Sequence, residues 1–147
     1  MTLPSESATP TTPGQPRRSD FRLFHRLRVR WSEIDMQGIV FNAHYLMYFD
    51  TAIGDYWRAL ALPYAPSMVA LGGELYARKA TLEFHASARL DDVLDVALRC
   101  ARVGTTSMTF AGALPGVSSR FSIWARKFTR REISAGARTA TVTASSA

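Results

Sequence analysis

Alternating hydrophobic and polar positions mark the first patterned segment of the chain. From Phe21 to Trp31 every second residue is apolar or histidine, and four of the five positions between them are arginines. A period of two residues is typical of a β-strand with one face on a core and the other in water. The pattern predicts a strand over residues 21–31, whose buried face carries Phe21, Leu23, His25, Leu27, Val29 and Trp31.

A long apolar segment begins soon after Gly38. Apolar residues recur there at helical spacing up to Leu60, and further apolar residues on the other faces predict a buried helix. Asn42 is a favoured N-cap, because its side chain can accept a hydrogen bond from a free amide of the first turn. We expect the helix to start near Asn42, to be about 28 Å long and to end at or just before Pro63.

The remainder of the chain contains strand-like runs separated by turn residues. A strand, a long helix and then a series of strands predict an α+β fold, in which one antiparallel sheet of five to six strands wraps a central helix. The expected strands after the helix cover residues 74–85, 93–103, 105–114, 121–128 and 138–143.

The two ends of the chain differ from its middle. Residues 1–18 are rich in Pro, Ser and Thr and have no hydrophobic period, which predicts a disordered N-terminal arm before one domain over residues 19–147. Within that domain, residues 117–147 form an atypical basic segment with six Lys or Arg and only one acidic residue, Glu132. Because the net charge of +6 belongs mainly to this segment, a solvated basic tail is the favoured interpretation.

Composition excludes several classes of protein. No apolar run is long enough to span a bilayer, and no secretory signal is expected. The single cysteine, Cys100, excludes an internal disulfide framework. These features favour a cytoplasmic protein that does not contact membranes. The three histidines lack metal-ligand spacing, and no glycine-rich nucleotide motif or G-x-S-x-G elbow is present.

The candidate chemistry lies between the first strand and the helix. Asp35, Gly38 and the expected helix start at Asn42 fall within eight residues. Free amides at a helix N-terminus can stabilise negative charge on a carbonyl oxygen, and a carboxylate beside them can activate water or attack the carbonyl carbon. On spacing alone, a simple turn or capping aspartate remains the alternative for Asp35.

The same residues resemble a known family, the hot-dog-fold acyl-CoA thioesterases, in its 4-hydroxybenzoyl-CoA thioesterase-like branch. The resemblance covers roughly residues 20–112, with a second and less specific match over residues 82–94 and 102–107. The specific motif reads Val29-Arg30-Trp31, then Glu33-x-Asp35-x-x-Gly38-x-Val40, then Asn42-x-x-Tyr45-x-x-Tyr48-Phe49-Asp50.

The resemblance implies an enzyme that hydrolyses an acyl-CoA thioester without a metal or organic cofactor. It also implies a homodimer or homotetramer whose active site lies across the subunit interface, and nucleic acid is not an expected partner. The acyl group itself is left open, as is the choice between coenzyme A and an acyl carrier protein.

Roles for individual residues follow from the resemblance. Asp35 is the expected catalytic residue, as general base or nucleophile, and Glu33 fills an acidic but non-catalytic position that we interpret as a solvated turn charge. The carbonyl-polarising amides are those of Asn42, Ala43 and His44, and the expected substrate contacts are Gly38, Val40 and Tyr45.

Two alternatives remain open at this point. The chain could be a non-catalytic acyl-thioester binder or a dehydratase-like protein of the same fold, with His44 as the base. More distantly, the aromatic and basic residues of the range 120–138 resemble a single-stranded nucleic-acid surface.

Overall fold

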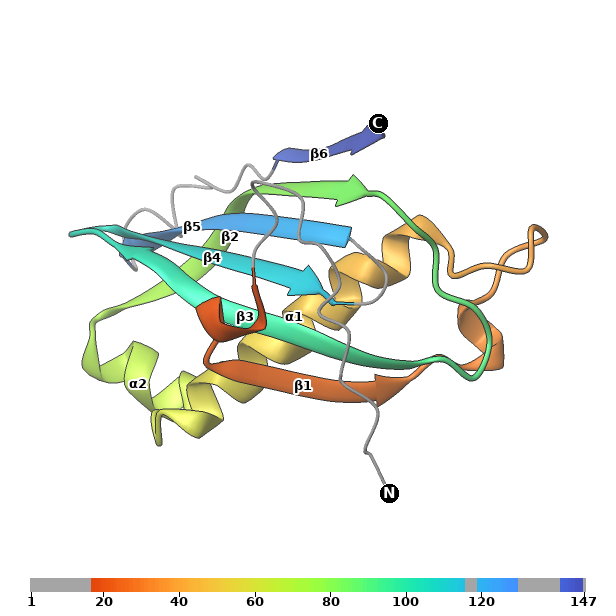
Figure 1. Ribbon diagram of the computed structural model, residues 1–147. Helices are drawn as coiled ribbons and strands as arrows, with labels where there is room; N and C mark the ends of the chain where they lie inside the picture. The colour runs from red at the N-terminus through yellow and green to blue at the C-terminus, as the bar shows by residue number, and fades with distance from the viewer. Residues whose placement is uncertain (1–16, 116–118, 130–140, 147) are drawn as a thin grey trace, which may run out of the picture.

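One long helix lies against a curved sheet of six strands (Figure 1). The computed structural model describes residues 17–115, 119–129 and 141–146, the last two ranges as backbone only. The sheet has the order β1-β3-β4-β5-β2-β6, so the expected α+β architecture is confirmed. The strands are β1 (Leu23–Arg28), β2 (Gly73–Phe84), β3 (Val93–Val103), β4 (Ser107–Leu114), β5 (Ser119–Thr129) and β6 (Thr141–Ser146), and the helices are α1 (Asn42–Ala59) and α2 (Tyr64–Ala70).

Strand β1 is shorter than the alternating pattern predicts. Its pairing with β3 ends at Arg28 opposite Val93, and a 3-10 turn, Trp31–Glu33, follows. Phe21 and Val29 are buried as expected, but Trp31 is 80% exposed. The prediction that Trp31 shares the buried face is therefore wrong, because the chain leaves the plane of the sheet before reaching it.

The sheet is antiparallel except at one edge. Strand β6 runs parallel to β2, from Lys79 opposite Thr141 to Phe84 opposite Ser146, so the expectation of a wholly antiparallel sheet is wrong for this pair. At Leu75, earlier along the same edge of β2, a side chain and not a strand binds the backbone groups. There the Tyr64 hydroxyl of α2 donates to the Leu75 carbonyl oxygen at 3.0 Å and accepts from the Leu75 amide at 3.3 Å.

Helix α1 packs into the sheet through one very close contact. Phe49 is completely buried, and its ring lies over Gly112 of β4. A Cβ atom added at Gly112 would stand 2.6 Å from Phe49 Cε1 and 3.0 Å from the Ala97 carbonyl oxygen. Only glycine therefore fits at residue 112 without moving the helix or the strand.

The helical segments differ from expectation at their ends. The N-cap position of α1 is occupied by Phe41, without a side-chain hydrogen bond, and Asn42 is the first helical residue. The expected capping role of Asn42 is thus wrong. Helix α1 ends at Ala59, and Pro63 becomes the N-cap of α2, a short helix that the sequence patterns do not predict.

Several expectations fall outside what the structure describes. The proposed arm of residues 1–18 is described only at Arg17 and Arg18. Backbone strands are present in the basic segment 117–147, but the side chains of the candidate nucleic-acid surface, residues 120–138, lie beyond the described residues.

Candidate active site

Asp35 opens a tight four-residue turn, residues 35–38, between two short extended segments. The Asp35 amide donates to the Ile39 carbonyl oxygen at 2.9 Å, and the Gly38 amide donates to the Asp35 carbonyl oxygen at 3.0 Å. Gly38 has a φ of +73°, a left-handed conformation that glycine adopts without strain. The turn fixes the backbone of Asp35, and the bridge between Ile34 and Val40 continues it toward α1.

The Asp35 carboxylate has one occupied oxygen and one open oxygen. Its Oδ1 accepts a hydrogen bond from the Gln37 amide at 2.8 Å, which is the turn role that spacing alone suggested. No hydrogen bond from the described residues reaches its Oδ2, and the residue is half-buried. The turn therefore orients the carboxylate through one oxygen and leaves the other available to a reacting group.

The start of α1 presents amides that no described residue accepts. The His44 amide donates to the Phe41 carbonyl oxygen at 2.9 Å, so it is already engaged. The amides of Asn42 and Ala43 have no acceptor within residues 17–115, and Phe41 supplies no side-chain cap. Two of the three expected amides are thus available, at the positive end of the helix dipole.

Electrostatics connects the Asp35 turn with the first turn of α1. Burial raises the pKa of the Tyr45 hydroxyl, and the negative charges of Asp92 and Asp35 raise it further. A hydrogen bond from the Ala88 amide, at 2.9 Å, acts in the opposite direction and lowers this pKa. Asp35 therefore lies within electrostatic reach of a residue one turn from the free amides.

Glu33 anchors the loop that carries Asp35. Its Oε2 accepts from the Tyr48 hydroxyl at 2.6 Å and from the Arg30 amide at 2.8 Å, and its carbonyl oxygen accepts from the Phe41 amide at 2.9 Å. Burial, together with the hydrogen bond and charge of Glu33, raises the pKa of Tyr48. Glu33 is only 9% exposed, so its interpretation as a solvated turn charge is wrong.

The three expected substrate contacts have different surroundings. Gly38 is exposed at the tip of the turn. Val40 and Tyr45 are each 1% exposed and pack in the core of the chain. Their side chains therefore support the site from within a single chain and do not line its surface.

Among the residues whose side chains are described, none pairs with His44 in a way that would make it a base of the dehydratase type. Its Nδ1 is buried without a hydrogen bond among the described residues, and its ring meets Phe41 edge-on at 6.2 Å between ring centroids. A histidine–carboxylate pair does occur elsewhere, between His25 of β1 and Asp55 of α1 at 2.5 Å. Within the described ranges, no three His, Cys, Asp or Glu side chains gather as metal ligands, and no helix is both long and apolar enough to cross a bilayer.

A curved sheet wrapped around one central helix defines the hot-dog fold. The family model of the thioesterase superfamily matches residues 37–114, just over half of the chain. The chain belongs to the thioesterase superfamily.

Individual relatives agree with this placement. The acyl-CoA thioester hydrolase YbgC of Escherichia coli is 32% identical over 87 residues, which cover 57% of this chain and 62% of that protein. The chain thus spans a little under two thirds of this relative.

Solved structures show the same fold. A hypothetical protein of Aquifex aeolicus has a TM-score of 0.68 at 26% identity, over 74% of this chain and 88% of the other. The DHNA-CoA thioesterase of Staphylococcus aureus has a TM-score of 0.67 at 12% identity, over 82% of this chain and 98% of the other, which concerns the fold alone.

Proposed function

We propose that this chain hydrolyses acyl-CoA thioesters to the free acid and coenzyme A, with Asp35 as the catalytic residue. The observation that carries the proposal is an Asp35 oxygen without a hydrogen bond from the described residues, seven residues before the α1 amides of Asn42 and Ala43, which have no described acceptor. A thioester carbonyl held by the amides of Asn42 and Ala43 would develop its negative charge against donors that are already oriented. The name of the YbgC relative supports coenzyme A as the carrier.

Two routes from this arrangement give the same products. As a general base, Asp35 removes a proton from water while the water oxygen attacks the carbonyl carbon, and the C–S bond then breaks to release the thiol. As a nucleophile, Asp35 attacks the carbonyl carbon itself, the thiolate leaves and takes up a proton, and water then cleaves the resulting anhydride. Both routes need the Asp35 oxygen that accepts no hydrogen bond within the turn.

The test is steady-state hydrolysis of an acyl-CoA panel with detection of the released thiol. Asp35→Ala is expected to lower kcat by roughly 10²–10⁴-fold, the usual contribution of a positioned base. Asp92→Ala is the matched control, because Asp92 likewise accepts a turn amide, from Arg89 at 2.8 Å. Equal rates for the wild type and Asp35→Ala would remove Asp35 from the mechanism.

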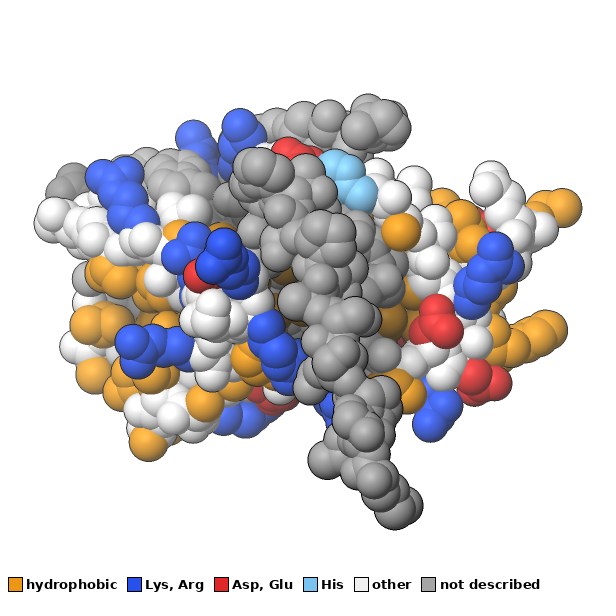
Figure 2. Space-filling view, in the orientation of Figure 1, with side chains coloured by type: hydrophobic (Ala, Val, Ile, Leu, Met, Phe, Trp, Pro, Cys, Tyr) orange, Lys and Arg blue, Asp and Glu red, His pale blue; other side chains and the backbone are white. Residues whose placement is uncertain are grey.

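We further propose that the working form is a homodimer or homotetramer. Large apolar side chains are exposed on the loop before α1 and on its first turns: Trp31, Met36, Phe41 and Met47. Hydrophobic side chains also protrude at the end of the molecule that carries this loop, at the right of Figure 2. Exposed apolar patches mark contact surfaces, and these side chains belong to the segment that carries the candidate active site.

A further inference from the structure

A second exposed apolar region lies at the end of the molecule opposite the Asp35 turn. Residues 60–72, the α2 segment, connect the end of α1 with the start of β2 (Figure 1). Hydrophobic side chains are visible at this end of the molecule, at the left of Figure 2. Five large side chains of the segment are at least 40% exposed: Leu60, Leu62, Tyr64, Val69 and Leu71. Nothing in the proposed hydrolysis uses this surface.

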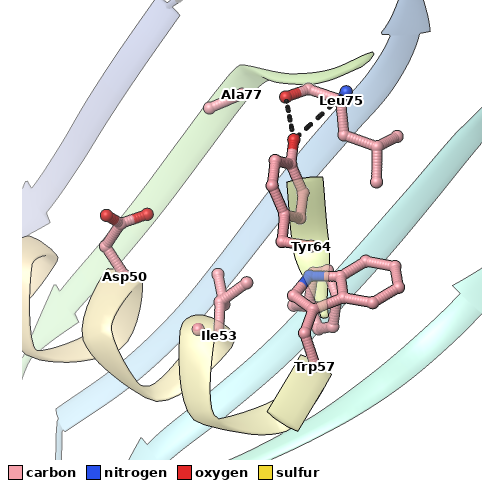
Figure 3. A pocket seen from close by; sticks show the side chains of 8 residues that line it. Asp50, Ile53, Trp57, Tyr64, Leu75 and Ala77 are labelled. Carbon is pink, nitrogen blue, oxygen red and sulfur yellow. Dashed lines mark hydrogen bonds between the residues drawn. The ribbon is translucent and has the colours of Figure 1, made fainter. Parts of the chain in front are cut away.

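The α2 segment is fixed to the rest of the chain from its inner side. Trp57 and Met68 are 7% and 4% exposed, and Trp57 meets the Tyr64 ring edge-on at 5.8 Å between ring centroids. Figure 3 shows the Tyr64 hydroxyl directed at the backbone of Leu75, where it bonds both the amide and the carbonyl oxygen. The outward apolar side chains therefore project from a base that is already ordered, and burying them requires little further ordering of the backbone.

The backbone of the α2 segment bonds most of its own amides. Three amides donate to carbonyl oxygens at the end of α1 and three more donate within the segment, at 2.9–3.2 Å: those of Leu60, Ala61, Leu62, Ser67, Leu71 and Gly72. Pro63 and Pro66 have no amide hydrogen. Only the amides of Tyr64 and Ala65, in the first turn of α2, have no acceptor among the described residues. A segment that enters an apolar layer must bond its own polar groups in this way, because water is absent there.

The charges near the α2 segment are mainly positive. Residues 56–73 contain one arginine and no acidic residue. On the neighbouring strand β5, the positions of Arg126 and Lys127 lie opposite the first residues of β2, so the basic C-terminal segment passes beside this end. Two carboxylates, Asp50 and Glu74, line cavities beside the segment. An anionic surface that approached this end would therefore meet more positive than negative groups.

We propose that the α2 segment docks this protein on the surface of an anionic phospholipid membrane. Leu62, Val69 and Leu71 enter the boundary between headgroups and acyl chains, and the basic groups around them meet the lipid phosphates. A second copy of the chain is a less favourable occupant, because two such ends bring like charges together. The expectation of no membrane contact rested on the lack of a bilayer-spanning run, and a segment that lies in the interface needs no such run.

Flotation with lipid vesicles tests this proposal on the full-length protein. The wild type should bind vesicles of equal parts phosphatidylcholine and phosphatidylglycerol roughly tenfold more strongly than vesicles of phosphatidylcholine alone, and about 0.5 M salt should release it. Leu62→Ser combined with Val69→Ser should weaken binding roughly tenfold or more, since these two side chains no longer gain from leaving water. Val93→Ser is the matched control, because Val93 is 50% exposed but is the first residue of β3.

Two outcomes overturn the proposal. One is a wild type that binds neither kind of vesicle, and the other is a double variant that binds as strongly as the wild type. The inference does not depend on the proposed hydrolysis, so Asp35→Ala should bind vesicles as the wild type does. Failure of docking and failure of the proposed function are therefore separate results.

A fluorescent label identifies the surface that enters the lipid. In a Cys100→Ser background, an environment-sensitive dye attached at Leu62→Cys should shift its emission to shorter wavelength when the mixed vesicles are added. The same dye at Val93→Cys should not shift. If the emission of the dye at residue 62 instead changes with protein concentration in the absence of lipid, a second copy of the chain covers the α2 segment and the inference fails.

Discussion

A single buried carboxylate joins the loop of the candidate active site to the central helix. Glu33 accepts hydrogen bonds from the Arg30 amide and from the Tyr48 hydroxyl, and its backbone holds Phe41 just before α1. Glu33 therefore joins the two ends of the loop between Arg30 and Phe41 and also ties this loop to α1 through Tyr48. Asp35 lies inside that closed loop, so its position depends on Glu33 even though Glu33 faces the interior.

Removing the Glu33 carboxylate should destabilise the protein. Glu33→Ala leaves the Tyr48 hydroxyl and the Arg30 amide without acceptors, which we expect to cost about 2–3 kcal/mol of unfolding free energy in urea. Glu33→Gln keeps an acceptor oxygen and should cost less than half of that. Combining Glu33→Ala with Tyr48→Phe should cost less than the sum of the two changes, and strict additivity would show that the two side chains are not coupled.

At the scale of elements, the fit of α1 against the sheet depends on two glycines in opposite ways. Gly112 is covered by the ring of Phe49, whereas a Cβ atom at Gly54 would meet only the end of the Arg58 side chain, at 3.5 Å. One glycine is required by close packing. The other only lowers the helix propensity of α1.

The two substitutions to alanine should therefore change the unfolding free energy in opposite directions. Gly112→Ala should lower the unfolding free energy by about 1–3 kcal/mol through overpacking, and Gly54→Ala should raise it by up to about 1 kcal/mol through helix propensity. Denaturant midpoints of the two variants and the wild type decide this. A neutral Gly112→Ala would mean that Phe49 moves away freely.

Two carboxylates tie β1 to its neighbours and make the contact pH-dependent. Burial opposes ionisation of Asp55, but hydrogen bonds from His25 and Arg58 hold its pKa below the usual 3.8. The hydrogen bond from Arg26 lowers the pKa of Asp95 in the same way. Because both folded-state values are depressed, their stabilisation is present above the unfolded pKa and is lost as the pH falls through the folded one.

Stability should accordingly fall below about pH 4. We expect the urea midpoint to drop less steeply between about pH 5 and pH 2.5 in Asp55→Asn combined with Asp95→Asn than in the wild type. Arg26→Gln should flatten the same slope in part, because it removes the main partner of Asp95. If the urea midpoint of the double variant fell with pH as steeply as that of the wild type, groups other than Asp55 and Asp95 would cause the acid sensitivity.

The elements differ in how far their sequence determines them. Strand β3 lies where alternation and the flanking turns predict it, and α1 follows from its helical spacing, since both depend on local pattern. Helix α2 was missed because seven residues that include Pro66 are too few to form an isolated helix, and its contacts with Trp57 and Leu75 are distant in sequence. Gly38 is enough to predict the turn of Asp35 from the sequence. The burial of Glu33 is not predictable in this way, because it depends on Tyr48, fifteen residues further along the chain.

For the whole molecule, the exposed apolar residues before and within α1 predict association of chains. Light scattering should give two or four chains per particle. Trp31→Arg should weaken association roughly thirtyfold or more, as does the loss of an aromatic side chain that is buried between two subunits. Val103→Arg is the control, since Val103 is also exposed, 71%, but is the last residue of β3. A wild type that is monomeric at micromolar concentrations would contradict the proposed assembly.

The covered edge of β2 limits how such an assembly can be built. Its outer backbone groups are engaged at Leu75 by the Tyr64 hydroxyl and from Lys79 to Phe84 by β6. Within the described sheet, β1 and β6 are the outermost strands, and β6 covers β2 only from Lys79 onward. Two copies that continue one sheet through main-chain hydrogen bonds should therefore meet along β1, along β6 or along the part of β2 before Lys79, and copies that meet over α1 must recognise each other by side chains.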